Sequence, residues 1–415
     1  MRILHTSDWH LGRSLEQISR IEEQKAFIDL LVAICEEERI DLVLVAGDIY
    51  DTYNPPASAE ELFYEALERL SGRGTRGVVV IAGNHDNPER LCAASPLAYK
   101  NGIILLGYPG SDAGAYKTGG EIRVAASGTG WFELALPHCE HHAVILSLPY
   151  PSESRLEEVL SREADEGILQ KAYSDKVGEI LDSGSRNFRE DTVNLVVAHL
   201  FMKGGRESES ERTLQVGGAW TVYPEALPAG AHYAALGHLH RPQEVRHAAC
   251  PAFYSGSPLA YSFSEAEHSK AVYLVDAQPG QKARVSPIYL NCGKPLRRWV
   301  AEEGYGQALT WCEEGRDRNA WVELTIVTDR ILTMEEQKKL RNLHPGIVNI
   351  YPRLKGEPGM VEYSASREGK KIDELFSEYY RIRMGADIPD EVMAAFLEIV
   401  NEQDEEVDAG EADIP

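Results

Sequence analysis

Side chains that can bind metal ions follow several short apolar runs of this sequence. They are Asp8, His10, Asp48, Asn84, His199, His238 and His240. Carboxylate, amide and imidazole donors without thiolates suit manganese, iron or similar divalent ions better than calcium or a structural zinc. We therefore interpret these residues as candidate ligands of a divalent-metal site.

Asp48 has the most informative position among these candidates. The run Leu42–Ala46 before it is apolar and mostly branched, which predicts a buried strand of a parallel sheet. Gly47 allows a sharp turn, so Asp48 lies just beyond the carboxyl end of that strand, where open α/β sheets place their ligands. A carboxylate has two oxygens and can bridge two cations, which one imidazole cannot do. We interpret Asp48 as that bridge.

Each motif by itself is weak evidence, because Gly, Asn and Asp are ordinary turn formers. The order and placement of all the motifs together favour a metal site, because turns have no use for this many histidines and carboxylates at strand ends. In an extended segment, side chains two residues apart point to the same side. We therefore expect the side chains of Asp8 and His10 to face the metal site together from one edge. The same is expected of His238 and His240 from another edge.

In the first part of the chain, strands are predicted at residues 2–7, 42–46 and 77–82. Helices are predicted between them, at residues 21–38 and 58–70. This is a βαβαβ layout, for which right-handed crossovers are expected. Further strands are expected at residues 102–106, 143–148, 192–198, 233–236, 253–258 and 270–275. Residues 152–181 predict a charged helix, and residues 202–218 predict a long polar loop of the kind that often carries function.

A turn-rich segment at residues 277–280 is the best linker candidate. We therefore expect a core domain over residues 1–277, a small α+β capping domain over 283–366, a helix-loop-helix over 370–402 and an acidic disordered tail over 403–415. Each of the two C-terminal helices carries one apolar stripe. The stripes fit either the groove of a partner or the core of this chain itself.

The composition limits the possible environments and partners. The 415 residues include six scattered cysteines without a Cys-x-x-Cys pair. We therefore expect neither a disulfide framework nor a zinc ribbon, and we expect a cytoplasmic location. No run is long and apolar enough for a membrane span, and the strand from Arg2 leaves no room for a signal peptide. The net charge of −24 argues against a broad basic surface that holds nucleic acid. It is compatible with a phosphate substrate bound through divalent metals.

Taken together, the motifs Asp-x-His, Gly-Asp, Gly-Asn-His-Asp and Gly-His-x-His, with a histidine at another strand end, resemble those of the calcineurin-like metallophosphoesterases. Within that superfamily the chain resembles the nuclease subunits of bacterial SbcCD complexes. The residues that carry this resemblance are those at 7–12, 47–51, 237–241 and 256–258. The resemblance covers nearly the whole chain. It implies an α/β core of sheet layers flanked by helices, with a small capping domain and C-terminal helices.

The resemblance also implies how two divalent ions, most simply Mn²⁺, would be held. One ion would take Asp8, His10, Asp48 and His240, and the other would take Asp48, Asn84, His199 and His238. His85 resembles the family's catalytic histidine, which contacts the phosphate or protonates the departing 3′ oxygen. Asp86 either holds the His85 ring in the useful tautomer or is a turn or helix-cap residue. Archaeal and eukaryotic relatives have a histidine where this chain has Asp51.

The activity implied by the resemblance is a manganese-dependent nuclease for DNA end processing, repair and recombination. It would degrade duplex ends from 3′ to 5′ and cut single strands and hairpins. The implied partner is an SbcC-type ATPase, bound at its coiled-coil base, in a heterotetramer that contains a dimer of this chain. Helices at residues 60–70 and 89–97 could form the dimer seam, although core packing would give the same pattern. A phosphatase or small-molecule phosphodiesterase is the alternative activity, and the intact ligand set argues against a non-catalytic scaffold.

Overall fold

The computed structural model describes residues 1–115, 121–152, 155, 166–208, 210, 211, 221–330 and 332–354, together with residues 376, 377, 388, 389, 392, 393 and 396. The chain divides into two compact units, Met1–Lys355 and Gly356–Pro415. No helix within the described ranges is long and apolar enough to cross a membrane.

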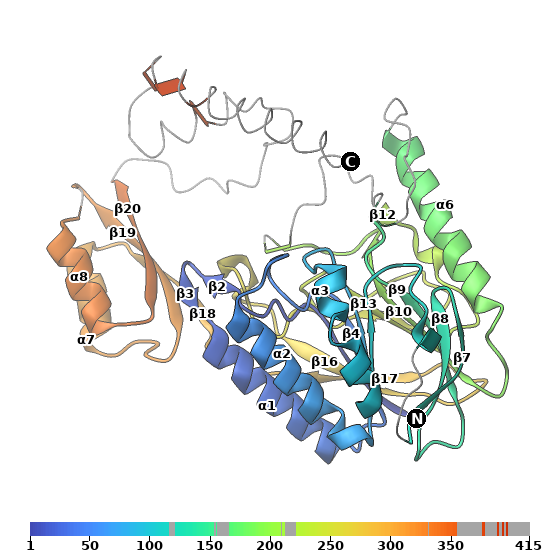
Figure 1. Cartoon of the computed structure of the whole chain (residues 1–415). Helices are drawn as coiled ribbons and strands as arrows, with labels where there is room; N and C mark the ends of the chain where they lie inside the picture. The colour runs from blue at the N-terminus through green and yellow to red at the C-terminus, as the bar shows by residue number, and fades with distance from the viewer. Residues whose placement is uncertain are drawn as a thin grey trace, which may run out of the picture. The chain divides into compact units, whose positions relative to one another are not determined.

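Two sheets form the centre of the first unit (Figure 1). The six-stranded sheet has the order β17-β16-β1-β4-β5-β6, with bounds β1 Arg2–Thr6, β4 Leu42–Ala46, β5 Gly77–Ile81, β6 Ile103–Leu106, β16 Ala271–Asp276 and β17 Arg284–Tyr289. The seven-stranded sheet has the order β14-β15-β13-β10-β9-β8-β7, with bounds β7 Arg123–Gly128, β8 Trp131–Ala135, β9 Ala143–Leu148, β10 Val193–His199, β13 Tyr233–Gly237, β14 Gln243–Glu244 and β15 Ala252–Tyr254. There are also two short strand pairs: β2 Ser14–Leu15 with β3 Ile18–Ser19, and β11 Phe201–Met202 with β12 Thr221–Val222.

The helices of this unit lie outside the sheets. Their bounds are α1 Ile21–Glu37, α2 Ala57–Leu70, α3 Pro88–Cys92, α4 Ser95–Ala98 and α6 Glu166–Ser185. Short 3-10 helices lie at η1 Gly72–Gly74, η2 Tyr99–Asn101, η3 Ala113–Ala115, η4 Pro224–Ala226 and η5 Phe263–Glu265. In the ribbon, α1 and α2 run side by side along the six-stranded sheet, and α6 lies against the other sheet (Figure 1).

The two faces of β4 show how the layers are held together. Val43 and Val45 point into the core under α1 and α2, whereas Leu42 and Leu44 point into the core between the two sheets. A strand that is buried on both faces needs a continuous apolar run, which is the pattern found at these positions. A third core lies between the seven-stranded sheet and α6, where Val177 packs. The two large sheets of the first unit therefore form a sandwich between helical layers.

The βαβαβ layout predicted from the sequence is confirmed. The strands β1 and β4 pair in parallel across α1, and β4 and β5 pair in parallel across α2. The helix α2 buries its apolar stripe, which includes Phe63 and Leu67, in the core of its own sheet. Core packing therefore accounts for the apolar pattern at residues 60–70, and a dimer seam at this helix stays a prediction.

The expected domain boundary at residue 277 is wrong. The strands β16 and β17 pair antiparallel from Ala271↔Tyr289 to Asp276↔Arg284 and extend the six-stranded sheet. Residues 277–280 therefore belong to the turn region of a hairpin and are not a linker. The core sheet continues to Tyr289, and the first strand of the small domain begins at Leu296.

The small domain has the element order β18 (Leu296–Ala301), α7 (Tyr305–Glu313), β19 (Trp321–Thr328), α8 (Met334–Leu343) and β20 (Ile347–Leu354). Its three strands pair in parallel, in the order β18-β19-β20, around a core of its own. The apolar runs at residues 321–327 and 347–351 predict the strands β19 and β20, and helices predicted near residues 307–313 and 334–343 match α7 and α8, whereas β18 is not predicted. The Trp321 indole donates to Glu23 of α1 over 3.0 Å, which joins this domain to the core.

The expected C-terminal helices at residues 370–402 lie mostly outside the described residues, and the expected tail at 403–415 lies entirely outside them. Within the second unit, the rings of Phe376 and Phe396 stack with centroids 3.7 Å apart. One of these residues comes from each predicted apolar stripe.

Candidate metal centre

The predicted ligands all lie at or just after the carboxyl ends of strands. The six-stranded sheet contributes the loops that carry Asp8, His10, Asp48 and Asn84, which follow β1, β4 and β5. The seven-stranded sheet contributes the end of β10 and the loop after β13, with His199, His238 and His240. The site is therefore assembled across the seam between the two sheets.

Several of these residues have unusual backbone conformations. The φ angles are 52° at Asp8, 45° at His10, 50° at Asp48 and 113° at His238. Positive φ is rare for residues other than glycine, and it is retained at functional sites where the surrounding structure enforces it. The extended geometry expected for Asp8 and His10 is therefore wrong. These side chains meet because the backbone turns left-handed, not because they alternate along a strand.

Neighbouring side chains hold the first of these loops in place. Trp9 is buried against Phe27 and Phe63 in edge-to-face contacts and anchors the loop in the core. The Gln24 amide donates to the His10 carbonyl over 2.9 Å and accepts from the Gly12 N–H over 3.1 Å. A side chain of α1 thus forms hydrogen bonds with the backbone of this loop. The His10 imidazole takes no part in these bonds and can face the metal site.

Two glycines allow the loops to approach one another. A Cβ atom on Gly83 would lie 2.0 Å from Oδ1 of Asp48, and one on Gly237 would lie 1.8 Å from the Ala46 carbonyl oxygen. Neither distance is compatible with a side chain. Gly83 is therefore required for the loops after β4 and β5 to approach each other, and Gly237 is required for the seven-stranded sheet to approach the end of β4.

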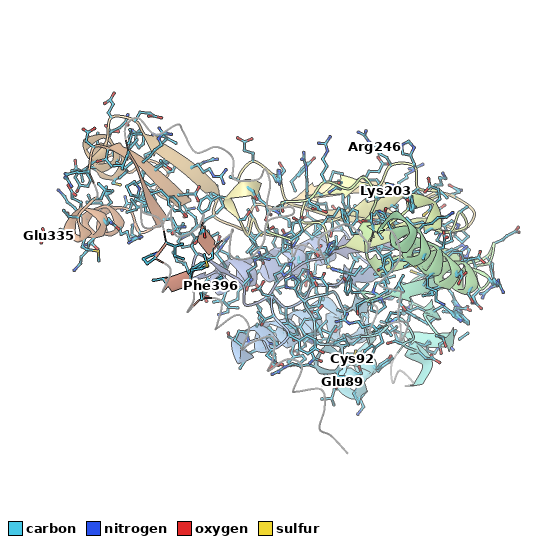
Figure 2. All side chains as sticks on the ribbon, turned by 90° about the horizontal axis from the view of Figure 1, so that it is seen from above. Glu89, Cys92, Lys203, Arg246, Glu335 and Phe396 are labelled. Atoms are coloured by element: carbon cyan, nitrogen blue, oxygen red, sulfur yellow. The ribbon has the colours of Figure 1, made fainter. Side chains whose placement is uncertain are left out.

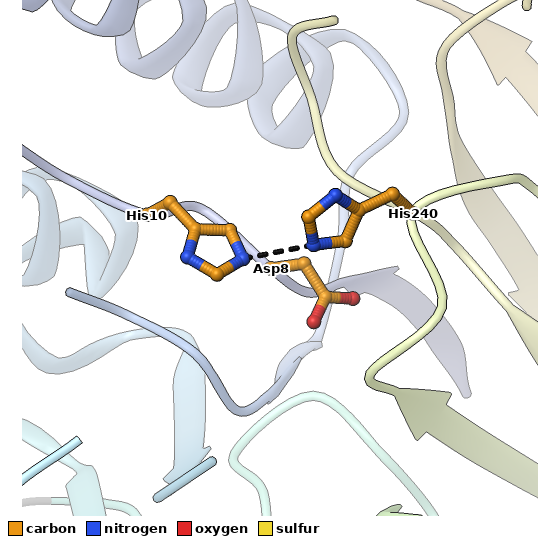
Figure 3. A group of neighbouring side chains, drawn as sticks. All are labelled: Asp8, His10 and His240. Carbon is orange, nitrogen blue, oxygen red and sulfur yellow. Dashed lines mark hydrogen bonds between the residues drawn. The ribbon is translucent and has the colours of Figure 1, made fainter. Parts of the chain in front are cut away.

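One group of ligands consists of Asp8, His10 and His240, whose ligand atoms lie within 4.8 Å of one another (Figure 3). The Nε2 atoms of His10 and His240 face each other at 2.9 Å. The Asp8 carboxylate accepts from Ser7 Oγ over 2.5 Å and from the His238 N–H over 3.0 Å. This group matches three of the four ligands expected for the first metal ion.

The remaining candidates form a second group next to the first. Nε2 of His199 lies 2.9 Å from Oδ1 of Asn84, and Nδ1 of His238 lies 3.1 Å from the same oxygen. Oδ2 of Asp48 lies 3.6 Å from Nε2 of His199 and 3.8 Å from Nε2 of His10, so it faces both groups. The structure thus brings together all seven residues that the sequence singled out. Asp48 has the intermediate position expected of a bridging ligand.

Burial determines the protonation of the site. It lowers the pKa values of His10 and His199 and lowers that of His238 to about 3, which favours the neutral imidazole that binds metal ions. Burial also raises the pKa of Asp8, and the charge of Asp48 adds to this effect. Burial alone would raise the pKa of Asp48, but His199 and His85 outweigh it, so that pKa is lowered. Two carboxylates buried this close together are stabilised in their ionised forms by cations.

The polar atoms of the site fit bound divalent ions. Nδ1 of His10 is buried and has no hydrogen-bond partner among the residues that the structure describes, and Oδ1 of Asp51 lies 3.6 Å from it. His10, Asp51 and His85 form a further group whose ligand atoms lie within 4.8 Å. The donors are imidazole, carboxylate and amide, which is the set that manganese and iron accept. The residues present could therefore hold two ions, with Asp51 at the margin.

The hydrogen bonds of His85 and Asp86 decide between the two interpretations of Asp86. Nδ1–H of His85 donates to the Asp51 carbonyl over 2.7 Å, which leaves Nε2 toward the site, 4.0 Å from Asp48. The Asp86 carboxylate accepts the backbone N–H groups of Gly83, Ile49 and Tyr50 instead. Asp86 therefore fixes the two loops that carry Asn84 and Asp48. The backbone carbonyl of Asp51, and not the Asp86 carboxylate, holds the His85 ring in one tautomer.

Sequence reasoning missed the residues that orient His240. Nδ1 of His240 lies 2.5 Å from Ser210 Oγ, and Ser210 in turn donates to Glu265. Lys270 forms a buried ion pair with Glu265 and donates to Ser257 Oγ over 2.8 Å. Burial would raise the pKa of Glu265, but Lys270 and His240 outweigh it, so the carboxylate stays ionised. Groups of this kind hold a ligating imidazole in one tautomer. No spacing in the sequence indicates them, although Ser210 lies in the predicted polar loop.

Comparison with known families agrees with this geometry. Residues 1–242 match the model of the calcineurin-like phosphoesterases, and residues 292–383 match that of the type 5 capsule protein repressor C-terminal domain. The chain is 44% identical over 98% of its length to the SbcD component of the SbcCD nuclease of Bacillus subtilis, of which it covers 99%. It is 32% identical to the corresponding protein of Rhodobacter capsulatus over 69% of each chain, and 28% identical to that of Staphylococcus epidermidis over 84% of each chain.

Among solved structures, a dimetal phosphatase from Danio rerio matches with a TM-score of 0.37 and 12% identity, over 69% of this chain and 98% of that one. This match adds nothing to the assignment. The family model spans more than half of the chain, and the Bacillus subtilis relative matches almost all of it. The chain therefore belongs to the calcineurin-like phosphoesterases and, within them, to the SbcD family of SbcCD nuclease components.

Proposed function

We propose that this chain is a two-metal DNA nuclease, active with Mn²⁺ on duplex ends from 3′ to 5′ and on single strands and hairpins. The observation that carries the proposal is the convergence of all seven predicted ligands, with His85 beside them. The family assignment supports DNA as the substrate, because its members carry the name nuclease.

The residues of the site divide the chemistry between them. Bound divalent ions would hold the phosphodiester, lower the pKa of a water molecule and stabilise the leaving oxygen. Asp48 would orient both ions, because its carboxylate faces both groups of ligands. His85 presents Nε2 toward the site while the Asp51 carbonyl holds Nδ1–H. That orientation allows His85 to contact the phosphate or to give a proton to the leaving 3′ oxygen.

A group of cations next to the site supports DNA binding by this acidic chain. A cavity of about 630 Å³ is lined by Lys203, Arg206, Arg241 and Arg246, against two glutamates, Glu225 and Glu244. Lys203 and Arg246 are labelled in Figure 2. Arg241 follows the ligand His240 directly. Within the described residues, none of the four cations forms an ion pair, so they are available to phosphate groups of a DNA strand.

A direct assay tests the proposal. The purified chain is incubated with Mn²⁺ and either hairpin DNA or a mononucleotide, and the products are separated by electrophoresis and assayed for inorganic phosphate. We expect cleavage of the hairpin and no release of phosphate from the mononucleotide. A chelator should abolish the cleavage. Phosphate release without DNA cleavage would identify a phosphatase and contradict the proposal.

We further infer that the chain acts with an SbcC-type ATPase, as a dimer within a heterotetramer. The name of the relatives implies such a complex. The C-terminal segment is the best candidate for docking on the ATPase coiled coil, because residues 356–415 form a compact unit of their own. The stacked rings of Phe376 and Phe396 bring together one residue from each predicted apolar stripe. For the dimer, Leu97 is 69% exposed and offers an apolar contact near residues 89–97.

Removing the residues after Lys370 is expected to abolish co-purification with the ATPase and to leave the manganese-dependent nuclease in place. The physical reason is that the ligands of the metal centre all lie in the first compact unit. Pull-down with the ATPase measures the first effect, and hairpin cleavage measures the second. A shorter truncation that removes only residues 403–415 serves as the control and should still co-purify. Aggregation or loss of metal in the longer truncation would show that the segment belongs to the core.

A further inference from the structure

A cavity with aromatic walls opens directly beside the metal centre. Its volume is about 440 Å³, and its lining includes Asn84, Tyr53, Tyr108, Tyr150 and Arg155. Asn84 is one of the candidate ligands, because its Oδ1 faces both His199 and His238. A group bound in this tyrosine cavity would therefore be next to any phosphate held at the metals. The volume lies within the range of pockets that bind small organic groups.

Two of the tyrosines are exposed in a way that packing does not explain. Tyr53 is 52% exposed and Tyr108 is 41% exposed, although both are large rings close to the site. Within the part of the chain that the structure describes, neither phenolic hydroxyl has a hydrogen-bond partner. Tyr150 is more buried, and its ring meets that of His199 edge to face at 6.1 Å. The cavity thus has two aromatic faces toward solvent and a third in contact with a candidate ligand.

The charge of the cavity is also suited to a nucleotide. Arg155 donates to the carbonyls of Gly83 and Asp86, over 2.8 and 2.7 Å, and so spans the loop that contains Asn84. Its guanidinium lies 5.7 Å from the centre of the Tyr150 ring. Among the described residues, no carboxylate lines the cavity. In a chain with a net charge of −24, a cavity without carboxylates beside the metal centre is a place that an anionic ligand can approach.

We propose that the tyrosine cavity binds the base of a nucleotide attached to the scissile phosphate. The proposal rests on the proposed nuclease function and deepens it. Stacking on tyrosine suits a nuclease without strong sequence preference, because every base has an aromatic face. The phosphate would lie at the metals while the base stacks on Tyr53 and Tyr108. The two contacts together would position the bond to be cut.

The test compares two probes that differ only by the base, deoxyadenosine 5′-monophosphate and deoxyribose 5-phosphate. Their dissociation constants are measured by calorimetry in buffer with Mn²⁺. We expect the nucleotide to bind the unmodified chain about tenfold more tightly than the sugar phosphate, the effect typical of one stacked base. Tyr53→Ala and Tyr108→Ala should each reduce this advantage, and the double variant should remove it. Tyr289→Ala, which changes a tyrosine that is 68% exposed on β17, is the matched control and should retain it.

Two results would overturn the base site. One is an unmodified chain that binds both probes equally. The other is a Tyr53→Ala/Tyr108→Ala variant that weakens both probes by the same factor, because that would indicate a structural role. Neither result depends on DNA cleavage, so failure of the nuclease function would be seen separately. Release of inorganic phosphate from the nucleotide would contradict the nuclease function. The difference in affinity between the nucleotide and the sugar phosphate could still be measured in that case.

Discussion

Replacing Asp48 with alanine is expected to remove both metal ions and all cleavage activity. Oδ2 of Asp48 faces His199 at 3.6 Å and His10 at 3.8 Å, so this carboxylate lies between the two groups of ligands. Without it, each ion would lose a ligand and the shared negative charge. Elemental analysis of the purified variant measures the metal content directly. Two ions retained by Asp48→Ala would contradict the bridging assignment.

Two comparison variants make this experiment specific. Asp48→Asn keeps an oxygen that can accept from the His85 N–H, a bond of 2.9 Å in the native chain, but loses the charge. It should fold and still lose metal, which separates loss of the bridge from loss of structure. Asp51→Ala should retain both ions, because Asp51 lies at the margin of the site. Loss of an ion in Asp51→Ala would instead assign a metal to the group of His10, Asp51 and His85.

His85→Gln is expected to slow DNA cleavage by about 10²–10⁴-fold, the range for loss of a general acid or base, while both metals remain bound. The imidazole is held by the Asp51 carbonyl with Nε2 toward the site. Glutamine can donate a hydrogen bond to the phosphate but cannot transfer a proton at neutral pH. Single-turnover cleavage of hairpin DNA with Mn²⁺ measures the rate, and elemental analysis measures the metals.

The matched control for this variant is His141→Gln, which changes an exposed histidine between β8 and β9. It should cleave at the native rate. Native turnover in His85→Gln would show that His85 only shapes the loop. Loss of metal in that variant would show that His85 is a ligand, in conflict with the assignment of His10, His199, His238 and His240 to that role.

The sequence predicts the parts of this molecule that depend on local patterns. The strand Leu42–Ala46 has the bounds expected, because a branched apolar run of this length can be satisfied only in a sheet that is buried on both faces. Once the strands are placed, parallel pairing brings their carboxyl ends to one edge. The proximity of Asp8, Asp48 and His199 follows from this arrangement without knowledge of any contact.

The features that sequence reasoning missed depend on contacts between distant segments. The Pro-Gly turn near residue 279 looks the same in a linker and in a hairpin, and only the pairing of β16 with β17 shows which one it is. Ser210, Glu265 and Lys270 meet at His240 across 30 to 55 residues. The left-handed backbone at His10 and His238 is enforced by packing around the loops, and histidine itself gives no sign of it.

The division of the ligands between two sheets has a consequence for the order of events during translation. Asn84 and His199 are 115 residues apart, so at typical rates of synthesis the ribosome needs roughly ten seconds to pass from one to the other. During that interval the nascent chain has carboxylates and an amide but lacks three of its imidazoles. The six-stranded sheet also waits for β16, which pairs with β1 and ends at Asp276. The full set of ligands and the pairing of β1 with β16 are therefore complete only after some two thirds of the chain has been synthesised.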